Sequence, residues 1–185
     1  YEMVALSVNA EVELSGLFRN SLQGDSTISL LFQQLGVETT FTRSGVLLKK
    51  EVRGQCERLT YDFVDIPDMA QTLVVTCTSL GIPFRFSGLQ SLKIKETDRL
   101  AALRTELRKF GYVLTEYDQS VLEWNGERCE PEKEPVVATY EDHRMAMAFA
   151  PMAICHKEGI RMADIEVVSK SYPSFWDDLK KAGLQ

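Results

Sequence analysis

KIKETDRLAALRTELRKFG, residues 93–111, decides how the surrounding chain is interpreted. Apolar side chains recur in it at steps of three or four, which is typical of a helix that lies on a core. These apolar residues are Leu100, Leu103, Leu107 and Phe110. We expect Thr97 or Asp98 to cap the helix and Gly111 to follow its last turn.

Charged residues crowd the start of this helix. Lys93, Lys95 and Glu96 precede it, and Arg99 lies in its first turn. The positive end of a helix dipole favours carboxylates, so cations at this position are unexpected. Two interpretations stay open from the segment alone: a solvated helix start of mixed charge, or cations and a helix N-terminus that converge on an anionic ligand.

The composition of the whole chain excludes several classes of protein. Its 185 residues, 44% hydrophobic and 26% charged, suit a globular protein of about one to one and a half domains. No apolar run reaches the ~20 residues that a membrane span needs, so we expect no membrane association. The net charge of −6 argues against non-specific binding of nucleic acid. We expect the sequence, which starts at Tyr1 without a signal peptide pattern, to be a fragment.

The four cysteines are widely scattered and form no CxxC pair. They are Cys56, Cys77, Cys129 and Cys155. This pattern predicts reduced thiols in a cytosolic protein, with neither a disulfide framework nor a zinc site.

Two segments of the chain share one plan. Each has a strand that ends in Ser-Gly-Leu, at residues 15–17 and 87–89, then a helix that ends at Gly36 or Gly111, then two strands. A repeated strand-helix-strand-strand unit indicates an α/β (α+β) domain with short sheets packed on helices.

Other elements follow from local patterns. We expect a hairpin with its turn at residues 43–45, helices at residues 26–35 (capped by Asp25), 69–80 and 144–155, and a last strand at residues 160–168. The second and third of these helices are apolar nearly all round, which predicts buried helices with outer sheets. Pro151 should kink the last helix.

Charged residues also stand at the starts of the buried helices. Asp68 suits an N-cap, which would explain it without any function. Arg144 opens an apolar helix and must find an anion there, either Asp142 or another acidic side chain. Lys170, among β-branched and aromatic residues, could reach solvent by its length alone. His143 by itself is more typical of a half-buried structural histidine.

Five short blocks together resemble the EPSP synthase family, the 3-phosphoshikimate 1-carboxyvinyltransferases. They are KETDR (residues 95–99), YEDHRMAM (140–147), RNSLQGD (19–25), IPD (66–68) and KSYP (170–173). Each block is weak evidence alone, but the five occur in the order and spacing of the family. The resemblance covers only the later half of the family's sequence.

The resemblance implies a fold and a division into domains. The fold would be that of the enolpyruvyl transferases, an inside-out α/β barrel with buried helices and outer mixed sheets. Residues 1–22 would form the end of an N-terminal domain and the hinge. Residues 23–185 would form the C-terminal enolpyruvyl transferase domain.

The resemblance also implies an activity. The family transfers the enolpyruvyl group of phosphoenolpyruvate to the 5-hydroxyl of shikimate 3-phosphate and releases phosphate, in the shikimate pathway that leads to chorismate and aromatic amino acids. It needs no metal and no organic cofactor, and it is the target of glyphosate. The implied partners are the two anionic substrates and the N-terminal domain of the same enzyme, in a cytoplasmic protein that is a monomer when complete.

Roles for individual residues carry over from matching positions of the family. The residues implied to bind phosphoenolpyruvate are Arg99, Arg144 and Lys170. Those implied to contact shikimate 3-phosphate are Lys95, at the 5-hydroxyl, and Asp68, which accepts its proton. Glu96 would protonate the methylene carbon of phosphoenolpyruvate, and His143 would assist Glu96.

The chain departs from the family pattern at two positions. Ser91 stands where an asparagine is frequent and Ile165 where a proline is common, and neither position carries charge. Two rival interpretations remain. One is the sister transferase that acts on UDP-N-acetylglucosamine, and the other is a non-catalytic anion-binding module on the same fold. Because a second domain supplies only half of such a site, we expect the fragment alone to be inactive.

Overall fold

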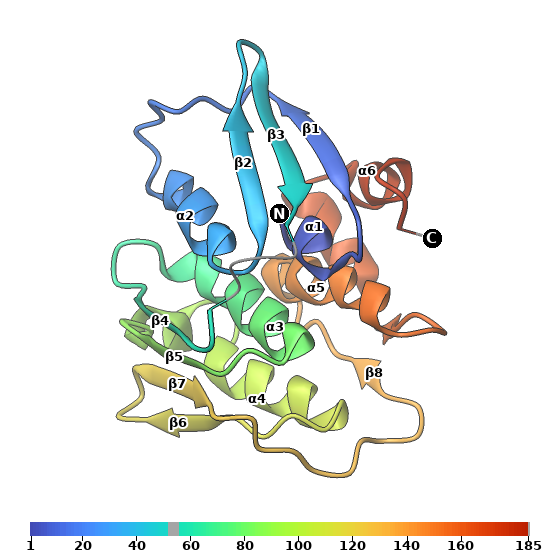
Figure 1. Cartoon of the computed structure of the whole chain (residues 1–185). Coiled ribbons are helices and arrows are strands. Elements are labelled where there is room, and N and C mark those ends of the chain that lie inside the picture. Colours follow the sequence, from blue (N-terminus) through green and yellow to red (C-terminus); the bar gives the residue numbers. More distant parts are fainter. Residues whose placement is uncertain (52–55, 185) are drawn as a thin grey trace.

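The computed structural model describes residues 1–51 and 56–184, in which three small sheets surround a group of helices (Figure 1). The α-helices are α1 (Glu2–Leu6), α2 (Ile28–Gln33), α3 (Ala70–Leu80), α4 (Arg99–Lys109), α5 (His143–Phe149) and α6 (Phe175–Lys181). The strands are β1 (Glu11–Ser15), β2 (Val37–Phe41), β3 (Gly45–Lys50), β4 (Leu59–Asp62), β5 (Phe84–Ser87), β6 (Thr115–Tyr117), β7 (Val121–Trp124), β8 (Val136–Val137) and β9 (Arg161–Met162). Short 3-10 helices are η1 (Gly24–Thr27), η2 (Pro67–Met69), η3 (Gln90–Ile94), η4 (Ala150–Cys155) and η5 (Ile165–Lys170).

The sheets confirm the repeat that the sequence predicts. The first sheet has the order β1-β3-β2 and is antiparallel throughout. The second has the order β4-β5-β7-β6, in which β5, β7 and β6 repeat the antiparallel arrangement of β1, β3 and β2. In both units a helix follows the first strand, and the later strand of the hairpin pairs with that first strand.

A second kind of unit carries the buried helices. Strands β4 and β5 are parallel and joined through α3, and strands β8 and β9 are parallel and joined through α5. Helix α3 packs against α1, α4 and α5, and its sequence AQTLVVTCTSL has no charged side chain. The helices therefore form the core and the sheets lie outside them, as the sequence predicts (Figure 1).

The glycines of the two Ser-Gly-Leu repeats occupy equivalent places after β1 and β5. Gly16 and Gly88 both have positive φ, +80° and +73°. A Cβ atom on Gly88 would lie 2.2 Å from Oδ1 of Asp62, whereas one on Gly16 would meet no atom within 4 Å. Both positions need the backbone freedom of glycine, but only Gly88 also lies in a tight contact.

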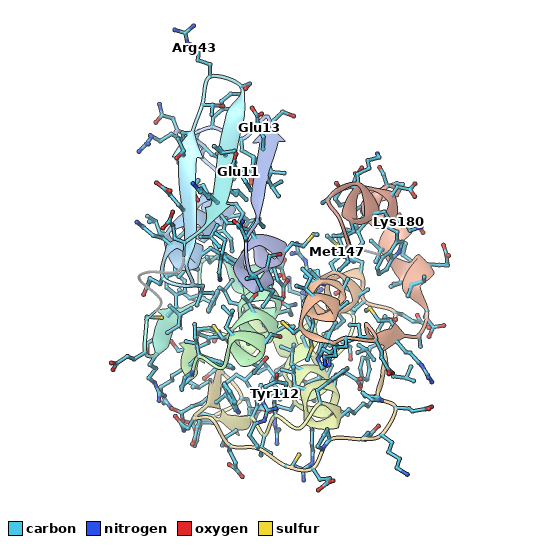
Figure 2. The ribbon with its side chains drawn as sticks, turned by 45° about the vertical axis from the view of Figure 1, so that its right-hand side comes forward. Glu11, Glu13, Arg43, Tyr112, Met147 and Lys180 are labelled. Carbon is cyan, nitrogen blue, oxygen red and sulfur yellow. The ribbon has the colours of Figure 1, made fainter. Side chains whose placement is uncertain are left out.

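The hairpin of the first sheet projects from the molecule. Arg43 lies at its tip and points into solvent, and Glu11 and Glu13 lie on the neighbouring strand β1 (Figure 2). The turn falls at residues 42–44, one residue earlier than expected, because Gly45 already belongs to β3. Charged residues on an edge strand such as β1 discourage pairing with another chain.

Three local predictions were wrong. The helix expected to reach residue 155 is α-helical only to Phe149, because Pro151 has no N–H for the helix ladder and a 3-10 helix continues from Ala150. The last strand is limited to β9, and the following residues form η5, in which Val167 and Val168 are both buried. Consecutive buried residues suit a helical turn better than a strand, whose side chains alternate between faces. Asp25 caps no helix through its side chain.

Residues 1–22 are part of the same core as the later residues. Helix α1 packs against α3 and η4, and β1 pairs with β3 along its whole length. The structure therefore shows no separation at residue 22, and the expected division at residues 22/23 stays a prediction about the longer protein.

Candidate functional site at three helix starts

The starts of α3, α4 and α5 converge on one side chain, Arg99. Its Nε donates to Oδ2 of Asp142 at 2.6 Å, and its terminal nitrogens donate to Asp68 and Glu96, each at 2.8 Å. The residue is only 1% exposed. A buried guanidinium needs such partners, because its charge is costly to bury unpaired. Three carboxylates of the protein itself therefore supply the counter-charge of Arg99.

Asp142 connects the starts of α4 and α5. Its carboxylate binds Arg99 through both oxygens and also accepts a hydrogen bond from the backbone N–H of Arg144 at 2.8 Å. It is fully buried and caps α5. Asp142 thus fixes the position of both arginines, although the sequence suggested it only as a partner for Arg144.

Asp68 contacts three cationic side chains and does not act as the helix cap that the sequence also allowed. Its side chain makes no cap hydrogen bond; Oδ1 lies 2.8 Å from Arg99 and 3.5 Å from Lys95, and Oδ2 lies 3.4 Å from Arg144. Burial raises the pKa of Asp68, but the charges of Arg144, Lys95 and Arg99 outweigh it, so the net pKa lies below the ordinary value. The carboxylate is therefore ionised at neutral pH and able to accept a proton.

The cluster has an open side. The side chains of Glu96, Lys95 and Arg144 are 47%, 35% and 33% exposed. Arg144 finds its expected anion in the Asp68 carboxylate, 3.4 Å away, and it also donates to the backbone carbonyl of Asp68 at 3.2 Å. An entering anion would contact Lys95 and Arg144 first, because Arg99 is buried behind them.

The other predicted residues are not joined to the cluster. His143 lies between Asp142 and Arg144 at the start of α5, half-buried, and its ring makes no hydrogen bond within residues 1–51 and 56–184. Lys170 is exposed at the end of η5, which packs against α5. Lys93 has a structural role, because it pairs with Asp98 at 3.0 Å and Glu116 at 2.8 Å.

Asp98, not Thr97, caps α4, and it does so by accepting from the N–H of Ala101. Among the described residues, no group of histidine, cysteine and carboxylate side chains is arranged to hold a metal ion. None of the helices in this part of the chain is long and apolar enough to cross a membrane.

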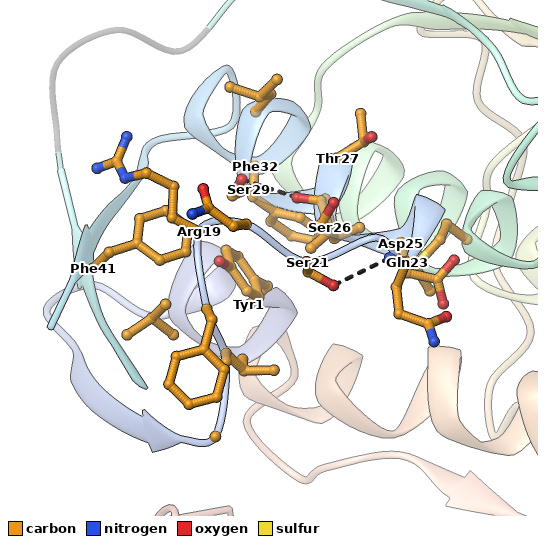
Figure 3. Close-up of a pocket in the computed structure, with 18 of the residues that line it drawn as sticks. Tyr1, Arg19, Ser21, Gln23, Asp25, Ser26, Thr27, Ser29, Phe32 and Phe41 are labelled. Carbon is orange, nitrogen blue, oxygen red and sulfur yellow. Dashed lines mark hydrogen bonds between the residues drawn. The ribbon is translucent and has the colours of Figure 1, made fainter. Parts of the chain in front are cut away.

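A large cavity, whose lining Figure 3 shows, is formed by residues outside the charged cluster. Its volume is about 1040 Å³, and it is bounded by α1, α2 and the RNSLQGD block, with Met69 and Thr72 at the edge nearest Asp68. Arg19 is its one basic lining residue in the described chain, and that guanidinium lies 4.7 Å from the ring centre of Phe41. None of the seven predicted site residues lines it.

Buried helices inside small repeated sheets, with cations and carboxylates at the helix starts, define an α/β domain suited to small anions. The family model described as EPSP synthase (3-phosphoshikimate 1-carboxyvinyltransferase) matches residues 1–179, and the chain belongs to this family.

Relatives and solved structures agree with this assignment. A 3-phosphoshikimate 1-carboxyvinyltransferase of Bacteroides fragilis is 60% identical over the whole chain, and a chloroplastic one of Petunia hybrida is 33% identical over 92% of it. The structure of EPSP synthase from Acinetobacter baumannii covers the whole chain with a TM-score of 0.74 at 21% identity, which supports the fold. The chain spans 44% of the length of the Bacteroides relative and 33% of the Petunia one.

Proposed function

We propose that the chain supplies one part of the active site of a 3-phosphoshikimate 1-carboxyvinyltransferase. The enzyme would transfer the enolpyruvyl group of phosphoenolpyruvate to the 5-hydroxyl of shikimate 3-phosphate and release phosphate. The observation that supports this best is the Asp68 carboxylate, held ionised among Lys95, Arg99 and Arg144 and close to Glu96. The cluster offers a base, an acid and cations for two polyanionic substrates.

The chemistry assigns a separate role to each carboxyl group. Glu96, in its protonated form and released from Arg99, gives a proton to the methylene carbon of phosphoenolpyruvate, which leaves positive charge at the adjacent carbon. The 5-hydroxyl oxygen attacks that carbon while Asp68 takes the hydroxyl proton, and a tetrahedral intermediate results. Removal of a proton from the new methyl group and departure of phosphate then restore the carbon–carbon double bond. Lys95 would hold the 5-hydroxyl, and His143 would assist Glu96.

The cations would bind phosphoenolpyruvate in two stages. Arg144 and Lys170 are exposed and can contact the ligand directly. Three carboxylates occupy Arg99, so it can bind the ligand only when Glu96, the most exposed of its partners, moves away. A guanidinium suits a carboxylate because it can donate two parallel hydrogen bonds.

The partners of this site would be the two substrates and an N-terminal domain of the same enzyme. The share of the relatives that the chain covers supports that proposal. The proposed enzyme would act in the cytoplasm as a monomer, without metal or organic cofactor. Residues 1–22 would then lie closest to the hinge.

The rival functions are weaker. The family model and the relatives carry the name of the shikimate enzyme, so the comparisons do not favour transfer to UDP-N-acetylglucosamine. A non-catalytic module would not need an ionised Asp68 beside Glu96 and three cations.

Replacing Arg144 by alanine in the longer enzyme that contains this chain tests the proposal. Loss of a charged hydrogen-bond donor should raise the KM for phosphoenolpyruvate about 10- to 100-fold. Steady-state assays of phosphate release measure it. Arg161→Ala is the matched control, because Arg161 is exposed on β9 and, within the described part of the chain, forms its one ion pair with Glu134. An unaltered KM in Arg144→Ala would contradict the assigned role.

A further inference from the structure

A buried carboxylate two turns along α4 from Arg99 lies outside the cluster. Glu106 is fully buried, and its carboxylate accepts from the hydroxyl of Tyr140 at 2.7 Å, from the N–H of Ala138 at 3.0 Å and from Nζ of Lys109 at 2.6 Å. Lys109 also donates to the carbonyl oxygen of Val136 at 2.8 Å. Glu106 and Lys109 thus hold residues 136–140 against α4. A buried carboxylate with three donors is a strong anchor.

The anchored segment leads straight into a strained turn. Tyr140 and Glu141, neither of them glycine, both have positive φ, 56° and 55°. Such a pair persists only where surrounding contacts hold it. Asp142 follows directly and binds Arg99, so α4 contacts this segment at its first turn as well as at Glu106.

We infer that Glu106 and Tyr140 are positioning residues of the site: their hydrogen bond holds the turn at Tyr140–Glu141, the turn places Asp142, and Asp142 aligns Arg99. Neither residue touches a substrate in this account. The inference rests on the proposed function only where it says that Arg99 is aligned in order to bind a substrate. The contacts themselves are independent of any ligand.

Glu106 and Tyr140 contribute different numbers of hydrogen bonds to the anchor. Tyr140→Phe removes one donor and leaves Oε1 of Glu106 without a partner, while Lys109 and Ala138 still bind Oε2. Glu106→Gln keeps the shape but removes the negative charge that pairs with Lys109, and its amide N–H₂ fits only a Tyr140 hydroxyl that turns to accept, so it weakens two of the three contacts. We therefore expect Glu106→Gln to have the larger effect on Arg99.

Nuclear magnetic resonance of the 185-residue chain tests the alignment without any ligand. The Nε–Hε signal of Arg99, identified by its loss in Arg99→Lys, reports the hydrogen bond to Asp142. Glu106→Gln and Tyr140→Phe should speed the exchange of the Arg99 Nε–Hε proton with water about tenfold or more. A tenfold change corresponds to the free energy of roughly one hydrogen bond. Asp142→Asn is the positive control.

A second variant separates positioning from general stability. Leu122→Ala removes a buried side chain from β7, away from residues 136–142, and lowers the unfolding midpoint without touching the anchor. It should leave the Arg99 signal protected under native conditions. The inference would be overturned if Leu122→Ala, at the same stability as Glu106→Gln, speeded exchange of the Arg99 Nε–Hε proton equally. It would also be overturned if Glu106→Gln left that exchange rate unchanged.

A kinetic experiment with the longer enzyme connects the alignment to the proposed reaction. Tyr140→Phe should raise the KM for phosphoenolpyruvate, and an unchanged KM and kcat would overturn the link between anchor and site. Wild-type enzyme that does not use phosphoenolpyruvate at all would refute the proposed function instead, while the exchange measurement would still decide whether Glu106 and Tyr140 align Arg99.

Discussion

Arg99 and Asp142 form the buried ion pair on which the site depends, with Nε 2.6 Å from the carboxylate and both residues almost fully buried. Asp142→Asn leaves the guanidinium without its main counter-charge and should lower the free energy of unfolding by about 3 kcal/mol. Urea unfolding measures this change. Asp178→Asn is the matched control, because Asp178 binds Lys181 and Tyr172 on the surface and its replacement should change stability far less. Equal losses for the two variants would contradict the role given to Asp142.

Tyr140 should titrate unusually late. Burial, followed by the hydrogen bond and charge of Glu106, raises its pKa to about 12, while a hydrogen bond with Thr105 opposes the shift slightly. Because the folded pKa lies above the unfolded value near 10, this tyrosine contributes stability that is complete below pH ~10 and is lost as the pH rises toward 12. Absorbance of tyrosinate after rapid pH jumps should show one late step, which Tyr140→Phe removes. Persistence of that step in the variant would assign it to another tyrosine.

Several residues of the candidate site could be predicted from the sequence, because each stands at a helix start beside an apolar run. Asp68, Lys95, Glu96, Arg99 and Arg144 do converge. The pairing of Arg99 with Asp142 was not predictable, since 43 residues separate the two and nothing local specifies which arginine the aspartate binds. Glu106 was also missed, although a glutamate within an apolar helix stripe signals a buried partner.

At the scale of elements, the two Ser-Gly-Leu repeats provide a matched pair of substitutions. Gly16→Ala should cost about 1–2 kcal/mol of stability, the penalty of a left-handed alanine. Gly88→Ala should cost clearly more, because its Cβ would also lie 2.2 Å from the Asp62 carboxylate and 2.5 Å from the Val64 nitrogen. Thermal or urea unfolding compares them. Similar losses would mean that the contacts around Gly88 relax at little cost.

Helices and hairpins with strong local signals were predicted well. The helix at residues 69–80 and the one after Asp98 have clear apolar patterns and glycine stops at Gly81 and Gly111. The extent of α5 and the nature of η5 were not predictable in the same way, because packing between them decides both: Val167 and Val168 of η5 are buried in one cluster with Ala146 and Ala150. Burial there overrides the β-propensity of the two valines.

At the scale of the whole molecule, the repeat predicts two strand-helix-strand-strand units and the apolar helices predict the inside-out layering, whereas the order of the strands in each sheet is known only from the structure. The relation of this domain to the rest of the enzyme could not be derived, since the charged cluster is open on one side. The expected boundary at residues 22/23 is an example. The family resemblance implies a hinge there, yet α1 and β1 pack in the common core.

The isolated 185-residue chain should therefore fold but have no measurable turnover. Half of the walls that would exclude water and hold the phosphates are expected to come from another domain. Phosphate release from phosphoenolpyruvate and shikimate 3-phosphate measures this, with host enzyme removed. Adding a separately prepared N-terminal portion of the longer enzyme is the positive arm. Turnover by the chain alone would contradict the proposal of a divided site.

The contact between Glu96 and Arg99 would compete with any anion that binds Arg99. Glu96 lies one turn from Arg99 on the same helix start and occupies one of its terminal nitrogens. Any incoming anion must displace this tethered carboxylate, whose effective concentration is far above that of free ions. A weakly held anion such as chloride gains too little to do so, whereas a carboxylate that forms two parallel hydrogen bonds can succeed. In the proposed site, this pairing would lower the affinity for every anion and favour those that can displace Glu96 from Arg99.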